Sequence, residues 1–249
     1  DVLEHWNTEN IYDKELRESL PGQLEYKYPY EQEGKLKLKF TVSELKKRAY
    51  LSEESGEELY EEPEVVPLLP EFLKEEIELT GASRGSAYHK LLELLDFSVQ
   101  YDEIALEKEI VRLQAEGKLS DDMAECIRIR DILAFLHCES GQRMHRAAQK
   151  QLLKKEQPFV LGVDAREIYP GEDSAETILV QGIIDVYFEE DEELVVLDYK
   201  TDKVRTARDL QEKYHSQLDY YAQALEQLTE KKVKEKIIYS FTLEEEIQV

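Results

Sequence analysis

Residues 181–202, QGIIDVYFEEDEELVVLDYKTD, decide the fold of this chain. Two apolar runs flank an acidic turn between Glu190 and Glu193, a pattern typical of a β-hairpin. In an antiparallel hairpin, opposed residues are found by stepping equally far from the turn along each strand. Five steps from each end of the turn bring Asp185 opposite Asp198. The register therefore predicts two carboxylates on adjacent strands, with Cβ atoms about 4.5–5.5 Å apart.

A third charge belongs to the same strand pair. Lys200 lies two residues beyond Asp198 and so on the same face of its strand. Burying two like charges costs several kcal/mol unless a partner compensates them, and a hard divalent cation is the usual partner of paired carboxylates. The alternative is that Asp198 and Lys200 lie exposed at a hairpin end, or simply pair with each other.

The helix expected after this hairpin carries a polar pair on its apolar face. Its stripe includes Tyr214 and Leu225, and both Gln217 and Tyr221 fall on that stripe. Buried amides and phenols need hydrogen-bond partners. Gln217 either caps a neighbouring backbone group, with Tyr221 as ordinary core, or both serve the carboxylate pair.

Two weaker candidates precede the hairpin. His89 lies in a helix that follows small residues, where a histidine is more often structural than a ligand. Glu156 opens an expected strand and is a further candidate carboxylate. The remaining histidines of the helical region and Cys126 and Cys138 lack zinc-ligand spacing, and we interpret them as structural.

Periodicity predicts an α/β chain with helices before the sheet and one helix inside it. A capping box at Thr41 and Glu44 predicts a helix from Val42. The other expected helices are 86–97, 103–116, 121–155 with a break at Ser140–Gly141, and 207–230. The expected strands are 35–41, 157–165, 177–189, 193–200 and 236–242.

Composition narrows the function classes. The formal net charge of −24 argues against free-standing adhesion to phosphate backbones, and it leaves open an acidic interaction protein with no active site. Residues 81–155 are neutral and end in a basic cluster, which is either a solvated helix face or a polyanion contact. The cluster comprises Arg143, Arg146, Lys150, Lys154 and Lys155.

No apolar run is long enough for a membrane span. Because Asp1 is followed by no charged-then-apolar leader, we expect no signal peptide and a processed chain or a fragment. Two cysteines exclude a disulfide framework, and also a four-cysteine zinc or iron–sulfur site.

Taken in order, five motifs carry a family resemblance: GSAYH at 85–89, EQPF at 156–159, GIID at 182–185, DYKTD at 198–202 and QLDYYAQAL at 217–225. The set resembles the RecB-like branch of the PD-(D/E)XK nucleases, and most closely the AddA type of helicase–nuclease. The resemblance implies a restriction-endonuclease-like α/β core: a central mixed β-sheet flanked by helices, with a helical insertion before the sheet.

The resemblance also assigns roles at matching positions. It implies that the ligands of Mg²⁺ or Mn²⁺ are His89, Glu156, Asp185, Asp198 and the backbone carbonyl of Tyr199. Lys200 would orient or help deprotonate the attacking water and offset charge on the scissile phosphate. Gln217 and Tyr221 match a QxxxY element that supports the site. The catalytic set is then Lys200, Asp198, Asp185, Gln217 and Tyr221.

As a whole, the resemblance implies a metal-dependent deoxyribonuclease, an exonuclease of the RecB/AddA type. Its substrate would be single-stranded DNA unwound by a helicase during double-strand-break repair and recombination in the bacterial cytoplasm. An AddB-like protein would be its partner in a heterodimer, no iron–sulfur cluster is expected, and ATP would act only through an upstream helicase region. The alternative is a catalytically inactive nuclease-fold module for docking or DNA guidance.

The expected organisation has three parts. Residues 1–48 would form a strand–helix segment that joins the chain to an upstream helicase region, and residues 49–72 an acidic linker, with the glutamates concentrated at 52–66. Residues 73–249 would form the nuclease domain.

Overall fold

The computed structural model describes residues 37–53, 84–169, 174 and 176–249. The first residues of the strand expected at 35–41 and most of the expected acidic linker lie outside the described residues.

The described residues contain one six-stranded mixed sheet. Its strands are β1 (Lys39–Thr41), β2 (Leu153–Asp164), β3 (Thr177–Glu190), β4 (Glu193–Lys200), β5 (Val233–Ser240) and β6 (Glu245–Gln248). The order is β1-β3-β4-β5-β6, with β2 paired to β3. β1–β3 and β4–β5 are parallel and the other pairs antiparallel. The expected mixed α/β sheet is confirmed.

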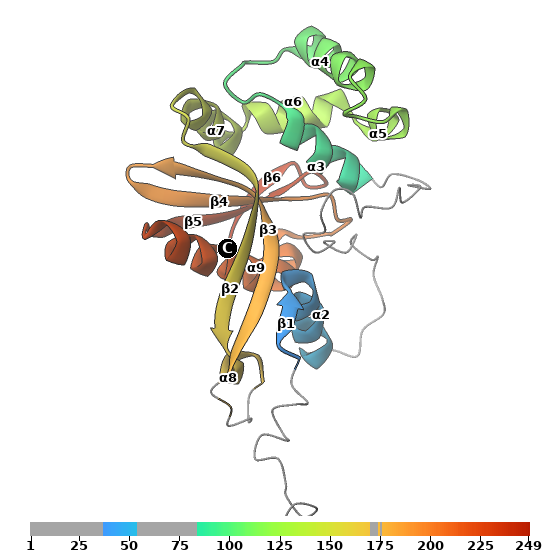
Figure 1. Ribbon diagram of the computed structural model, residues 1–249. Helices are drawn as coiled ribbons and strands as arrows, with labels where there is room; N and C mark the ends of the chain where they lie inside the picture. Colours follow the sequence, from blue (N-terminus) through green and yellow to red (C-terminus); the bar gives the residue numbers. More distant parts are fainter. Residues whose placement is uncertain (1–36, 54–83, 170–173, 175) are drawn as a thin grey trace, which may run out of the picture.

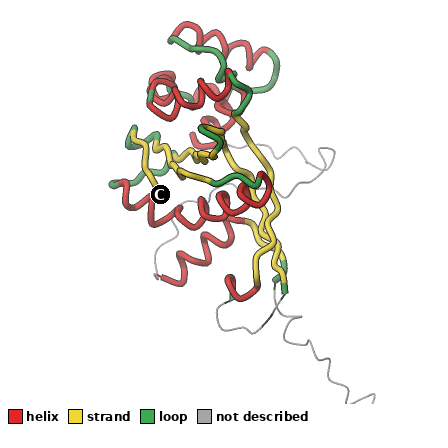
Figure 2. Tube along the Cα trace, turned by 90° about the vertical axis from the view of Figure 1, so that its left-hand side faces the viewer, coloured by secondary structure: helices red, strands yellow, loops and turns green. Residues whose placement is uncertain are grey.

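Helices cover both faces of this sheet (Figures 1 and 2). One layer precedes β2: α3 (Arg84–Leu94), α4 (Glu103–Ala115), α5 (Asp121–Cys126), α6 (Ile129–His137) and α7 (Glu139–Gln149). On the other side lie α2 (Val42–Glu53) and α9 (Ala207–Thr229), while the short α8 (Ala165–Ile168) follows β2. Each layer has its own apolar core, one centred on residues such as Phe135 and the other on residues such as Leu218.

The β3–β4 hairpin has the predicted register. Its pairs run from Glu190↔Glu193 to Val186↔Leu197. The two turn residues, Asp191 and Glu192, have φ values of 56° and 66°. Positive φ at both central positions is typical of the two-residue turn whose twist matches a hairpin, and this turn sets the register.

β3 changes its partner along one edge. β2 pairs along one edge as far as Phe188, while β1 pairs with the other edge as far as Gln181. On that second edge β4 takes over at Val186, so the ladders leave 182–185 without a strand partner there. The sheet therefore forks beside Asp185.

The helical prediction for 121–155 needs correction. The chain breaks at Ile127–Arg128 and at Cys138, and not at Ser140–Gly141. Cys138 is extended, and its sulfur accepts a hydrogen bond from the Gly141 amide as the N-cap of α7. The helix also ends earlier than predicted, because residues from Leu153 pair with β3. β6 and α8 were not predicted.

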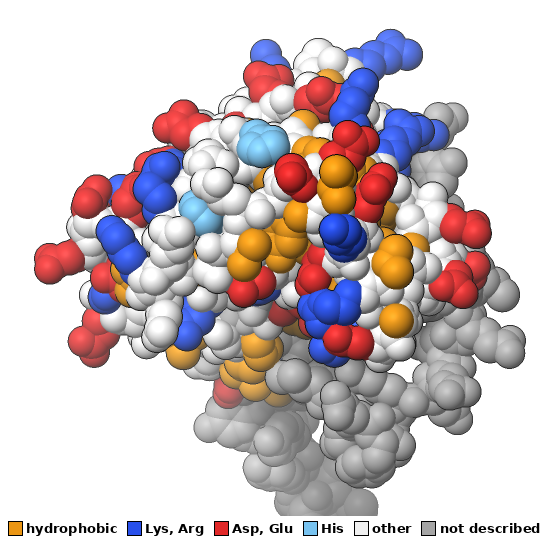
Figure 3. Space-filling view, turned by 90° about the horizontal axis from the view of Figure 1, so that it is seen from above, with side chains coloured by type: hydrophobic (Ala, Val, Ile, Leu, Met, Phe, Trp, Pro, Cys, Tyr) orange, Lys and Arg blue, Asp and Glu red, His pale blue; other side chains and the backbone are white. Residues whose placement is uncertain are grey.

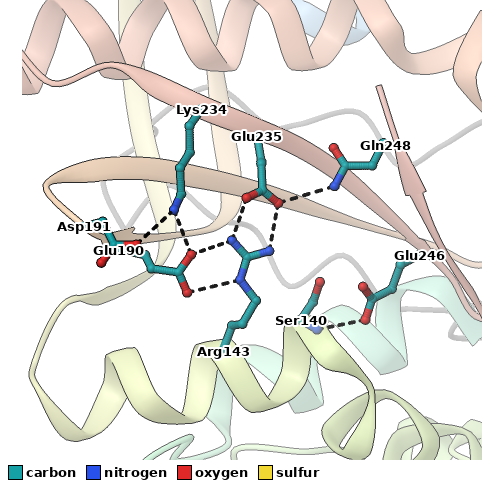
Figure 4. Close-up of polar contacts among 8 residues, drawn as sticks. All are labelled: Ser140, Arg143, Glu190, Asp191, Lys234, Glu235, Glu246 and Gln248. Carbon is teal, nitrogen blue, oxygen red and sulfur yellow. Dashed lines mark hydrogen bonds and ion pairs between the residues drawn. The ribbon is translucent and has the colours of Figure 1, made fainter.

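Figure 4 shows why the interpretation of the basic cluster was wrong for Arg143. This side chain is only 10% exposed, and its guanidinium contacts Glu190 of β3 at 2.7 Å and Glu235 of β5 at 2.8 Å. Lys234 also reaches Glu190 at 2.8 Å. Arg143 therefore clamps α7 to the sheet, while Arg146 is exposed on the same helix.

The outer helical layer has a mixed surface. Figure 3 looks down on it and shows apolar side chains gathered among charges of both signs. Val99, Ile104 and Val111, in and just before α4, are among the exposed large hydrophobic residues. In the part of the chain that the structure describes, no helix is both long and apolar enough to span a bilayer.

Candidate metal centre and active site

Asp198 and Lys200 lie at the end of β4 and face α9. The Lys200 Nζ is 2.9 Å from Asp198 Oδ2, and the two residues are only 6% and 1% exposed. They do pair with each other, but inside the protein rather than at an exposed hairpin end. Burial raises the pKa of Asp198 to about 7, with Lys200 opposing the shift and Asp185 adding to it.

Gln217 and Tyr221 of α9 complete this side of the site. The Gln217 amide nitrogen donates to the Tyr221 hydroxyl at 2.7 Å and contacts Asp198 Oδ1 at 3.4 Å. The prediction that Gln217 caps a backbone group is therefore wrong. Its Oε1 atom is buried and has no hydrogen-bond partner among the described residues. An open acceptor thus lies beside the Asp198 carboxylate.

Asp185 lies at the fork in the sheet. Its Oδ2 accepts a hydrogen bond from the Tyr199 amide at 2.9 Å, one position past the last ladder pair of β3 and β4. The same oxygen is 3.4 Å from His89 Nδ1. Burial alone would raise the pKa of Asp185, but the neighbouring His89 and Lys200 charges hold it below its usual range.

His89 approaches from α3, on the opposite side to α9. Its Nε2 is 3.0 Å from the Tyr199 carbonyl oxygen, and its ring meets the Tyr199 ring edge-on. Burial lowers the pKa of His89, but the Asp185 carboxylate outweighs this and raises the pKa to about 9. His89 thus connects two of the groups predicted to bind metal.

Glu156 enters from β2. The ladder pairs its neighbours Lys155 and Gln157 with β3 but skips Glu156, whose φ is 47°. The register places Glu156 opposite Asp185. Burial, and then the Asp185 charge, raise the pKa of Glu156 to about 7.

Three of the predicted ligands form one group. His89, Glu156 and Asp185 each offer a ligand atom within 4.8 Å of the others. The Tyr199 carbonyl is next to the same histidine. One imidazole with two carboxylates and a carbonyl is a donor set that suits Mg²⁺ or Mn²⁺. Asp198 is outside this group because its oxygens face Lys200 and Gln217.

Two residues near the site were not singled out from the sequence. Tyr214 of α9 is fully buried, with its ring centroid 4.3 Å from Lys200 Nζ. Its hydroxyl donates to Asp202, at 3.0 Å from each carboxylate oxygen. Tyr214 was visible only as an apolar stripe residue, because the stripe does not show which side chain it meets.

Comparison with known proteins identifies relatives of this arrangement. The family model described as the PD-(D/E)XK nuclease superfamily matches residues 63–247. The AddA protein of an ATP-dependent helicase/nuclease from Lachnoclostridium phytofermentans is 35% identical over 94% of this chain and 22% of its own length. Proteins of the same name from Clostridium botulinum strain Loch Maree and Clostridium kluyveri are each 34% identical, over 96% of this chain and 19% of theirs.

The chain thus spans about a fifth of the length of the curated relatives it matches. The matched region includes the whole sheet fork, and the five motifs lie within it. This chain belongs to the PD-(D/E)XK nuclease superfamily, as an AddA-like member.

Proposed function

We propose that this chain is a divalent-metal-dependent deoxyribonuclease that hydrolyses phosphodiester bonds in single-stranded DNA. The observation that carries the proposal is the fork of β3 and β4. There the group of His89, Glu156 and Asp185 lies beside a buried lysine–carboxylate pair. Such a pairing of a cation site with an ammonium group suits the charge that develops on a phosphate during hydrolysis.

The residues divide the work between two sides of the fork. His89, Glu156, Asp185 and the Tyr199 carbonyl would hold Mg²⁺ or Mn²⁺, with Asp198 on the border of the site. When bound, the cation supplies Lewis-acid polarisation of a phosphoryl oxygen and lowers the pKa of a water molecule.

Lys200 acts from the other side. Its ammonium group can donate a hydrogen bond to the attacking water and offset charge on the scissile phosphate. Asp198 keeps that ammonium in place at 2.9 Å, and Gln217 and Tyr221 orient Asp198 from α9. The unpartnered Gln217 Oε1 can accept a hydrogen bond from a water molecule at the site.

The wider context follows from the relatives. AddA proteins of ATP-dependent helicase/nucleases match this chain over about a fifth of their length. We propose that the chain is the nuclease part of such an enzyme and works as an exonuclease on strands delivered by a helicase, with an AddB-like partner, in double-strand-break repair in the bacterial cytoplasm. The net charge of −24 supports delivery, because an acidic chain attracts DNA poorly by itself.

Cleavage of labelled single-stranded DNA tests the proposal. Micromolar chain is incubated with Mg²⁺, Mn²⁺ or EDTA, beside Asp198→Asn and the control Asp219→Asn, an exposed aspartate on α9. We expect metal-dependent cutting by the wild type and the control, and its loss in Asp198→Asn. Binding of Mn²⁺ without cutting would mean that the site needs delivered DNA. Absence of both would favour the inactive module.

A further inference from the structure

The position of the Lys200 ammonium depends on more than its carboxylate partner. A lysine has a long flexible side chain, and one ion pair leaves much of its rotamer freedom in place. Asp198 Oδ2 contacts Nζ at 2.9 Å, and the Tyr214 ring lies 4.3 Å from the same nitrogen. The ammonium therefore has an anionic contact and an aromatic contact.

Tyr214 is itself held in a fixed orientation. Its side chain is fully buried, and its hydroxyl donates to Asp202, 3.0 Å from both carboxylate oxygens. Lys213 pairs with the same carboxylate at 2.5 Å. Lys46 of α2 approaches the Tyr214 ring, again with 4.3 Å between Nζ and the centroid. The ring thus has two cations near it and a carboxylate that fixes its hydroxyl.

We propose that Tyr214, oriented by Asp202, is a positioning residue for Lys200 in phosphodiester hydrolysis. This inference rests on the proposed nuclease function and deepens it. The electron-rich ring face attracts the ammonium in a site from which water is largely excluded. It thereby limits Nζ to positions beside Asp198 and does not touch the substrate. The second aspartate of the DYKTD motif, Asp202, acquires a role through the same contact.

The test compares Tyr214→Phe with Tyr214→Leu, each in the wild-type chain and in Lys200→Ala. Phenylalanine keeps the ring, whereas leucine removes it and keeps an apolar side chain. Single-turnover cleavage of labelled DNA with Mn²⁺ gives the rate, and calorimetry with Mn²⁺ alone gives the metal affinity. Thermal unfolding shows whether each variant is folded at the assay temperature.

We expect Tyr214→Leu to lower kcat by about 10- to 30-fold, as expected from the loss of a desolvated cation–π contact. KM and Mn²⁺ affinity should stay within about threefold, and Tyr214→Phe should recover most of kcat. In the Lys200→Ala background, the leucine substitution should have no further effect, because the group that it positions is gone.

A merely structural role would slow both backgrounds by the same factor, and that result would overturn the inference. If Tyr214→Leu does not fold, Asp202→Ala replaces it, because Asp202 is only partly buried. Its kcat should then fall in the wild type and not in Lys200→Ala, and an unchanged kcat in the wild type would overturn the inference alone. A wild-type chain that neither cuts DNA nor binds Mn²⁺ would overturn the proposed function and this inference together.

Discussion

Replacing Arg143 with methionine should destabilise the fold without touching the candidate site. Methionine keeps apolar contact over Phe188, which Arg143 now covers with its guanidinium 5.5 Å from the ring centroid. The substitution removes the hydrogen bonds to both Glu190 and Glu235 (Figure 4).

The magnitude follows from what the glutamates keep. Removing one member of a fully buried ion pair costs about 3–5 kcal/mol. Here Glu190 retains Lys234 at 2.8 Å, and the Glu190 and Glu235 side chains are 30% and 26% exposed. A polar cavity of about 420 Å³ beside the clamp also lets water reach them. We therefore expect a loss of about 2 kcal/mol in the free energy of unfolding at pH 7.

The loss should depend on pH. Hydrogen bonding from Arg143, partly opposed by burial, lowers the pKa of Glu190 to about 2 from its usual 4.5. A carboxylate with a depressed folded-state pKa stabilises the fold above its unfolded pKa, and this contribution disappears as the pH falls toward the folded value. The difference between wild type and Arg143→Met should be full above about pH 5 and shrink between pH 4.5 and 2.

Urea unfolding followed by circular dichroism at pH 7 and pH 3 measures this difference. Arg146→Met, an exposed arginine on the same helix, is the matched control and should change stability by less than about 0.5 kcal/mol. A loss below about 0.5 kcal/mol for Arg143→Met at pH 7, or an equal loss at both pH values, would refute the reasoning.

Two further substitutions probe the site and the helical layer. His89→Ala should weaken Mn²⁺ binding by at least about tenfold in calorimetry, whereas Lys90→Ala, next to it but outside the ligand group, should not; equal affinities would exclude His89 as a ligand. Gly141→Ala should cost about 3 kcal/mol in urea unfolding, because a Cβ there would lie 2.2 Å from the Phe135 carbonyl oxygen. Gly162→Ala, whose Cβ meets only a Thr177 methyl at 3.0 Å, should cost less than about 1 kcal/mol, and a similar loss for both would contradict the packing argument.

The hairpin was predictable because local rules determine it. A short acidic turn between two apolar runs fixes the register, and the pairs observed from Glu190↔Glu193 onward match the prediction. The same register placed Asp185 and Asp198 near each other without any knowledge of the fold. Pairing of β1 and β5 with distant strands depends on tertiary contacts that periodicity does not reveal.

The site was predictable in membership but not in its division. The sequence does not show that Asp198 faces α9 while Asp185 faces His89, because this depends on the fork where β3 changes partner. Glu156 had only a weak signal, since its place opposite Asp185 arises from the β2–β3 register. Arg143 was misread because the carboxylates that bury it lie far away in the sequence.

Lys200→Ala tests the proposed division of the site most directly, because it removes the ammonium group and leaves the metal ligands in place. Mn²⁺ calorimetry and single-turnover cleavage are measured on this variant beside Lys203→Ala, an exposed lysine three residues away. We predict Mn²⁺ affinity within about threefold of the wild type and cleavage slower by about 100-fold or more, with Lys203→Ala close to the wild type in metal affinity. A Lys200→Ala chain that cuts DNA at the wild-type rate would contradict the role proposed for this lysine.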